Sequence, residues 1–158
     1  DIWLPDLKYY SPILSRRYSQ AEDYFAVASR AVEQMIRLTG PPEFGEYKDK
    51  RSGTACSILR KGVIIRHMVL PRHKDDSIRL LYWMKDTLPK GGFLISLMSQ
   101  YTPFYRSADY PEINRRITTY EYEKVLNTAI ELGLTDGFMQ EKSSAKEEYT
   151  PPFELEGL

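Results

Sequence analysis

The stretch of residues 62–71 limits the possible folds more than any other part of the chain. It reads Gly-Val-Ile-Ile-Arg-His-Met-Val-Leu-Pro, so apolar and mostly β-branched side chains fill consecutive positions instead of alternate ones. Such a run is typical of a strand with both faces buried, as in a parallel sheet covered by helices. We therefore expect a central parallel strand at residues 62–71.

Two helix-start signals lie on either side of this strand. Ser19 followed by Glu22 has the spacing of a capping box, and apolar residues then recur at helical spacing up to Gly40. The same spacing occurs at Thr118 and Glu121, ahead of a second apolar stripe that ends at Gly133. Each signal predicts a long amphipathic helix.

The other expected elements complete an alternation of strands and helices. They are a strand at residues 2–8, a hairpin around residues 49–53 within the polar segment 41–61, a helix capped by Asp75 or Asp76, and strands at residues 93–101 and 137–141. Alternating elements predict an α/β fold with parallel strands and right-handed crossovers. No strand is followed by a dinucleotide-binding or Walker glycine motif, so barrel geometry is the better prediction.

Charge and composition exclude several classes of function. Lys and Arg total 22, as do Asp and Glu, so no net charge draws the chain to nucleic acid or to an anionic membrane. No apolar run is long enough to span a bilayer and no signal-peptide pattern is present, which favours a cytoplasmic protein. The single cysteine, Cys56, excludes an internal disulfide and is read as an inert thiol.

Polar residues gather where the predicted strands end, which is where α/β barrels place their functional groups. They are Asp6 and Lys8, Arg66 and His67, and Ser99, Gln100 and Tyr101. Asp6 and Lys8 lie on one strand face and suit the amine and carboxylate of a zwitterionic ligand, or they form a local salt bridge. Arg66 lies within an apolar strand and needs an anionic partner, either a protein carboxylate or a ligand. His67 and His73 are read as structural histidines.

An aromatic and basic segment follows the predicted strand at residues 93–101. Arg106, Arg115 and Arg116 occur close to Tyr101, Tyr105 and Tyr110, which could bind RNA by stacking and phosphate contacts. Asp109 and Glu112 dilute its positive charge. A protein-interaction surface is therefore the better interpretation of this segment.

Four segments in order carry a family resemblance. They read Asp-Leu-Lys-Tyr-Tyr from position 6, Ile-Arg-His-Met-Val-Leu-Pro from 65, Ile-Ser-Leu-Met-Ser-Gln-Tyr-Thr-Pro from 95, and Tyr-Pro-Glu-Ile-Asn-Arg-Arg from 110. Together they resemble the C-terminal half of a radical S-adenosylmethionine protein of the pyruvate formate-lyase-activating-enzyme-like family. The resemblance implies that residues 1–158 are one domain, the C-terminal portion of a partial (β/α)6 barrel that lacks the N-terminal cluster-binding half. The start at Asp1 fits this expectation.

The same resemblance implies a set of cofactor-binding residues. Asp6 and Lys8 match an Asp-x-Lys motif that lies against S-adenosylmethionine, and Arg66 matches a strand arginine near the same ligand. Gln100 and Tyr101 occupy the end of the next strand, where close members of the family have a histidine. Arg72 occupies a position where relatives commonly have glycine.

The implied activity belongs to a longer parent protein. Family members are oxidoreductases that cleave S-adenosylmethionine reductively with a [4Fe-4S] cluster held by a Cys-x3-Cys-x2-Cys loop, and this chain has no such loop. The parent would act on a glycyl-radical enzyme or another protein substrate, with flavodoxin or ferredoxin as reductant. This chain alone is expected to be inactive, to hold neither cluster nor cofactor, and to self-associate through an open strand edge. The alternative is a non-catalytic protein-interaction module that uses the aromatic and arginine-rich surface.

Overall fold

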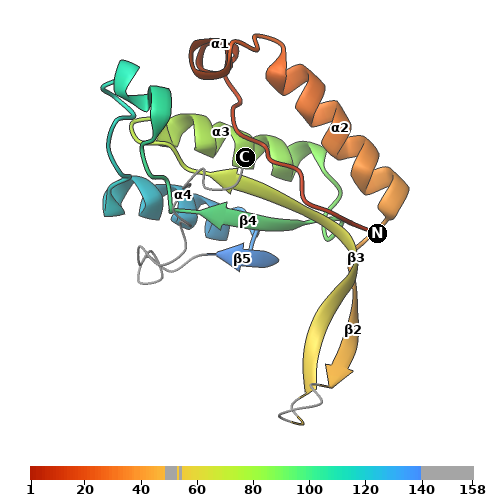
Figure 1. Cartoon of the computed structure of the whole chain (residues 1–158). Coiled ribbons are helices and arrows are strands. Elements are labelled where there is room, and N and C mark those ends of the chain that lie inside the picture. The colour runs from red at the N-terminus through yellow and green to blue at the C-terminus, as the bar shows by residue number, and fades with distance from the viewer. Residues whose placement is uncertain (49–52, 54, 140–158) are drawn as a thin grey trace, which may run out of the picture.

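The structure is a computed structural model that describes residues 1–48, 53 and 55–139. Its strands are β1 (Ile2–Trp3), β2 (Glu43–Lys48), β3 (Ala55–Met68), β4 (Leu94–Met98) and β5 (Gly137–Met139). Its helices are α1 (Pro12–Ser19), α2 (Tyr24–Thr39), α3 (Lys74–Thr87) and α4 (Thr119–Glu131), with a 3-10 turn η1 at Tyr105–Asp109. Figure 1 shows their arrangement.

The sheet confirms the predicted α/β class and the central place of β3. The strand order is β1-β3-β4-β5, and these neighbours all pair in parallel. β2 pairs only with β3 and runs antiparallel to it, so the sheet is mixed. The strand predicted at residues 137–141 is present as far as Met139, and its last two residues lie outside the described part.

β3 is longer than predicted and belongs both to the sheet and to a separate hairpin arm. It covers 14 residues and starts at Ala55, upstream of the expected start at position 62. Its first half pairs with β2 to form a two-stranded arm (Glu43–Lys48 with residues 55–61) that projects away from the sheet (Figure 1). The arm confirms the predicted hairpin, although most of the turn around residues 49–53 lies outside the described residues.

Gly62 marks the point where the arm meets the sheet. Its φ of 150° and a backbone carbon of Pro42 only 3.1 Å from where a Cβ would lie leave little room for a side chain. Glycine therefore allows the two chains to approach closely at this point.

Only one face of β3 is buried, which corrects the expectation that both are. Val63, Ile65 and His67 are buried, whereas Ile64 and Met68 are half-buried and Arg66 is exposed. The buried face packs in one core with apolar residues of α2, α3 and α4, among them Val32, Leu80, Leu81, Met84, Tyr122 and Val125. No described helix covers the opposite face, and apolar composition alone did not reveal that.

The start of the chain runs beside β3, but only two of its residues form a regular strand. The predicted strand 2–8 is reduced to Ile2–Trp3 and an isolated bridge between Asp6 and Arg66. Around that bridge, the Arg66 N–H donates to the Pro5 carbonyl and the Leu7 N–H donates to the Arg66 carbonyl, both at 2.9 Å. Proline has no N–H to give, so the ladder is interrupted at Pro5.

The capping prediction at Ser19 is wrong. Ser19 ends α1, a helix that the sequence analysis missed, and α2 begins after Asp23 without a side-chain cap. α1 starts at Ser11, whose hydroxyl accepts the Ile13 N–H, and Pro12 occupies the first helical position. The Ser-Pro pair was the available signal for this start.

The other two cap predictions have opposite outcomes. Thr118 and Glu121 form the predicted capping box, with the Glu121 N–H donating to Thr118 at 3.2 Å and the Thr118 N–H donating to Glu121 at 2.9 Å. α3 instead has His73 at its N-cap, so neither Asp75 nor Asp76 caps it. The Asp76 carboxylate accepts the N–H groups of Tyr10 and Ser11 and thereby ties the chain before α1 to α3.

No helix in the described part of the chain is both long enough and apolar enough to cross a membrane.

Candidate functional site

A pocket of about 400 Å³ lies where β3 and β4 end, and we call it the C-terminal-edge pocket. It is lined by Asp6, Lys8, Tyr9, Arg66, Met68, Leu70, Met98, Gln100 and Tyr101. All of the predicted site residues, Asp6, Lys8, Arg66, Gln100 and Tyr101, therefore face one hollow. They meet because the parallel strands β3 and β4 and the chain from Asp6 to Lys8 end at the same edge of the sheet.

Asp6 and Arg66 form an ion pair in this pocket. Both Nε and an outer nitrogen of Arg66 lie 2.7 Å from the Oδ1 of Asp6. The two side chains remain 41% and 43% exposed, so water and ligands can reach them. The protein carboxylate is thus the partner that Arg66 needs, and the expected local salt bridge forms with Arg66 instead of Lys8.

The contacts use only one oxygen of the Asp6 carboxylate. No hydrogen bond to its Oδ2 is present within the described residues, so this oxygen can accept from a ligand. A carboxylate shared between an arginine and an amine binds both through charge-assisted hydrogen bonds.

Lys8 is positioned through its backbone by a residue that the sequence analysis missed. The Tyr24 hydroxyl donates to the Asp6 carbonyl at 2.8 Å and accepts the Lys8 N–H at 2.9 Å. Burial raises the pKa of Tyr24, which keeps the hydroxyl protonated as this arrangement requires. Tyr24 lay within an apolar helical stripe, and that pattern carries no signal for such a clamp.

The rest of the pocket wall is apolar and aromatic. Met68, Met98 and Leu70 lie beside Tyr9 and Tyr101, and burial raises the pKa of Tyr101. The amide nitrogen of Gln100 lies 4.0 Å from the Met98 sulfur. The pocket therefore combines one carboxylate, two cations and an apolar wall, a combination suited to a zwitterion with an apolar or aromatic substituent.

The remaining strand-end candidates do not line this pocket. His67 is buried on the helix-covered face, where its ring nitrogens contact the Leu7 carbonyl at 2.7 Å and the Ser77 hydroxyl at 2.8 Å. Burial lowers the pKa of His67 and keeps it neutral, in agreement with a structural role. Ser99 is buried, and His73 contacts the Tyr18 hydroxyl through Nε2 at 2.7 Å.

Part of the aromatic and basic segment is committed to internal contacts. Arg115 holds both oxygens of Glu121, at 2.9 and 2.7 Å, and Tyr110 donates to the Arg17 carbonyl at 3.0 Å. Phe104 and Tyr105 remain 76% and 81% exposed and are the apolar residues that this segment offers to a partner.

Metal-binding groups are not found in the described residues, where no three His, Cys, Asp or Glu side chains lie close enough to hold one ion. Cys56 is exposed and lies on the β3 half of the arm.

The comparisons with known proteins found similarity to part of a longer protein. It is 29% identical over 131 residues to an uncharacterized protein of Methanocaldococcus jannaschii. The match covers 82% of this chain and 31% of that protein, so the chain spans about a third of the length of this relative. No family model matches the chain, and no solved structure matches it.

Proposed function

We propose that this chain forms the cofactor-binding wall of a radical S-adenosylmethionine oxidoreductase that resembles pyruvate formate-lyase-activating enzyme. In this proposal the chain is the C-terminal portion of a partial (β/α)6 barrel, and the uncovered face of β3 is the inside of the barrel. The observation that carries the proposal is the convergence of Asp6, Lys8, Arg66, Gln100 and Tyr101 on one pocket of about 400 Å³.

The residues of the C-terminal-edge pocket suit the amino-acid end of S-adenosylmethionine. The Oδ2 of Asp6 can accept from the α-amino group, and the Lys8 ammonium and Arg66 guanidinium can attract the carboxylate. The apolar wall of Met68, Met98 and Leu70 excludes water from one side of the pocket. These groups bind and orient the ligand.

The cluster does not fit this chain, because a [4Fe-4S] site needs three cysteines and the chain has one. In the proposal, the cluster and its Cys-x3-Cys-x2-Cys loop belong to the remainder of a longer parent. When bound together, cofactor and cluster supply reductive cleavage of S-adenosylmethionine. The parent's proposed partners are a glycyl-radical enzyme or another protein substrate and a flavodoxin or ferredoxin reductant.

The decisive test uses the longer protein. It is reconstituted anaerobically with iron and sulfide, and release of 5′-deoxyadenosine from S-adenosylmethionine is measured. We expect Asp6→Ala and Arg66→Ala each to lower the rate about tenfold or more, because each removes a charged contact to the ligand. Asp86→Ala and Arg79→Ala are matched controls, since these residues line a separate surface hollow on α3.

The Asp6–Arg66 pair is well suited to this test. Exposed ion pairs add only about 0–1 kcal/mol to stability, so both variants should fold. Rates equal to those of the control variants would refute the assignment of these residues. No cluster and no product from the unmodified parent would refute the proposed function.

A second candidate is a non-catalytic interaction module, and the exposure of Phe104 and Tyr105 favours it. Adjacent exposed aromatic residues are common anchors of protein interfaces. A Phe104→Ser and Tyr105→Ser double variant that loses a protein partner while the parent shows no cofactor cleavage would support this candidate.

A further inference from the structure

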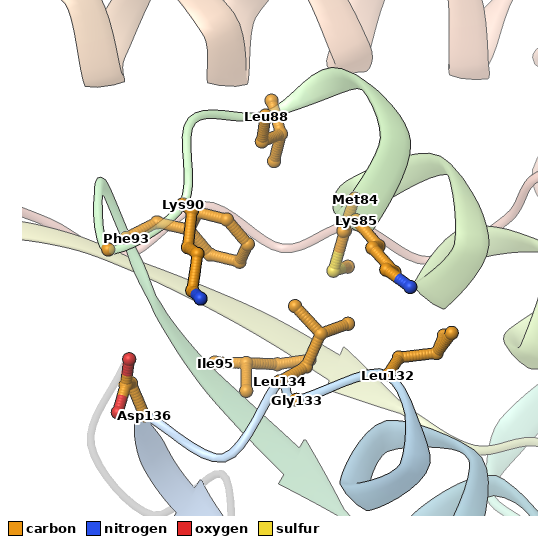
Figure 2. Close-up of a pocket in the computed structure, with 11 residues that line it drawn as sticks. Met84, Lys85, Leu88, Lys90, Phe93, Ile95, Leu132, Gly133, Leu134 and Asp136 are labelled. Atoms are coloured by element: carbon orange, nitrogen blue, oxygen red, sulfur yellow. The ribbon is translucent and has the colours of Figure 1, made fainter.

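A second hollow lies at the opposite edge of the sheet, and we call it the N-terminal-edge cavity. It has a volume of about 280 Å³ and is enclosed by the ends of α3 and α4 and the start of β4 (Figure 2). Its lining residues are Met84, Lys85, Leu88, Lys90, Gly91, Phe93, Ile95, Leu132, Gly133, Leu134 and Asp136. It shares no residue with the C-terminal-edge pocket.

The floor of this cavity belongs to the hydrophobic core. Met84, Leu88, Phe93 and Ile95 are buried members of the main core cluster, and Leu134 packs against it. Met84 and Ile95 are 0% and 1% exposed, so the apolar surface that a ligand can reach comes from Leu88, Phe93 and Leu134. An apolar group of suitable size would therefore gain contacts by entering.

The rim of the cavity carries charges on two sides. Figure 2 shows Lys90 and, below it, Asp136 at one side of the hollow and Lys85 at the other side. No ion pair involving these three side chains is present in the described part of the chain. Their charges are therefore available to a ligand.

The backbone fixes Asp136 and Lys90 at the rim. The carbonyl of Asp136 accepts the Ile95 N–H at 2.9 Å, which ties this residue to the start of β4. Lys90 lies in a tight turn closed by the Gly92 N–H donating to the Pro89 carbonyl at 2.9 Å. These hydrogen bonds hold the backbone of the rim, so a ligand has only the side chains of the rim to order when it binds.

We propose that the N-terminal-edge cavity binds a free amino acid with an apolar side chain. Such a molecule carries a carboxylate and an ammonium on one carbon, with the side chain leaving in a third direction. Its carboxylate meets Lys90, its ammonium meets Asp136, and its side chain fills the apolar floor. Leucine is the probe of choice, because methionine resembles part of the ligand proposed for the other pocket.

Methionine methyl groups make the two hollows distinguishable in one spectrum. Met84 lines the N-terminal-edge cavity, whereas Met68 and Met98 line the C-terminal-edge pocket. In the chain labelled with 13C-methyl methionine, leucine should shift the Met84 methyl signal in a saturable way and leave Met68 and Met98 unchanged. The proposed function is tested separately, by 5′-deoxyadenosine release from the longer protein, so failure of one proposal does not affect the other.

Two half-ligands test the role of the charged rim. 4-Methylpentanoate keeps the carboxylate and the leucine-like chain but has no amine, and 3-methylbutylamine keeps the chain and amine but has no carboxylate. We expect each to bind about tenfold more weakly than leucine, since a charge-assisted hydrogen bond is lost. Affinities for the half-ligands equal to that for leucine would overturn the proposed recognition.

Charge-removing variants assign the roles of Asp136 and Lys90. Asp136→Asn should weaken leucine binding about tenfold and leave 4-methylpentanoate binding unchanged, because that half-ligand has no amine. Lys90→Gln should also weaken leucine binding about tenfold, and it should leave 3-methylbutylamine binding unchanged, because that half-ligand has no carboxylate. Asp86→Asn and Lys124→Gln are the matched controls outside the cavity. A Met84 signal that leucine does not shift, or leucine binding that neither rim variant weakens, would overturn the proposal.

Discussion

Glu121 is expected to be one of the main contributors to the stability of this fold. Its carboxylate accepts two hydrogen bonds from Arg115, at 2.9 and 2.7 Å, and one from the Arg72 N–H at 2.7 Å. It also closes the capping box with Thr118, at 2.9 Å from both the backbone nitrogen and the hydroxyl. One buried side chain thus joins α4, the chain before it and the turn after β3.

Glu121→Gln removes the charge and keeps the shape of this side chain. Hydrogen bonds to a charged group contribute about 1.5–3 kcal/mol and a helix cap about 1 kcal/mol. Arg115 remains partly exposed, so water replaces some of what is lost. We expect the free energy of unfolding at pH 7 to fall by about 2 kcal/mol, measured by urea denaturation followed by circular dichroism.

The pH dependence provides an independent check of the same reasoning. The hydrogen bonds from Arg115 hold the pKa of Glu121 well below its usual range. Because the pKa is lower in the folded state, this stabilisation is complete above the unfolded value of about 4.5 and is lost as the pH falls through the folded value. The difference between the original protein and Glu121→Gln should therefore shrink between pH 5 and pH 3.

Glu123→Gln is the matched control, because Glu123 is exposed on the same helix. It should change the free energy of unfolding by less than about 0.5 kcal/mol at either pH. A similarly small effect of Glu121→Gln at pH 7, or a difference that stays constant down to pH 3, would refute the assignment.

Two further predictions concern the turn after β3 and the open sheet edge. Arg72 has a φ of 64°, a left-handed conformation that glycine adopts more easily than other residues. Arg72→Gly should therefore raise the free energy of unfolding by about 1 kcal/mol, and Arg72→Val should lower it. Both changes are measured by urea denaturation. An unchanged midpoint for both variants would contradict this. The edge strand β1 exposes Ile2 and Trp3. The chain should therefore sediment as a dimer or larger species at high concentration in analytical ultracentrifugation. Trp3→Lys should shift this equilibrium toward the monomer. A monomer throughout the concentration range would rule out that interface.

The contrast between two identical spacings shows what sequence reasoning can and cannot reach. Thr118 and Glu121 form their capping box, whereas Ser19 and Glu22 have the same spacing and do not. The difference lies upstream, because Ser11 and Pro12 start a helix that ends at Ser19, and the Ser19 hydroxyl contacts the Tyr9 hydroxyl at 3.0 Å. Local motifs compete for the same residues, and a motif read alone does not show which one prevails.

The location of the candidate site could be predicted from the sequence, but the ion pair that forms within it could not. Strand ends of a parallel sheet share one edge, so Asp6, Lys8 and Arg66 were expected near Gln100 and Tyr101. That Asp6 pairs with Arg66 depends on the register between the first residues and β3, which no short-range pattern encodes. The Tyr24 clamp and the N-terminal-edge cavity depend on packing between distant segments and left no signal in the sequence.

The bridge between Asp6 and Arg66 has a consequence for the order of folding. These residues are 60 positions apart, and closing a flexible loop of that length costs about 3.6 kcal/mol plus a constant in chain entropy. β3, α3 and β4 are consecutive and close much shorter loops among themselves, so contacts within this unit are expected early. The C-terminal-edge pocket comes into existence only when the first residues dock on β3, and a ligand bound there would hold the amino-terminal segment in place.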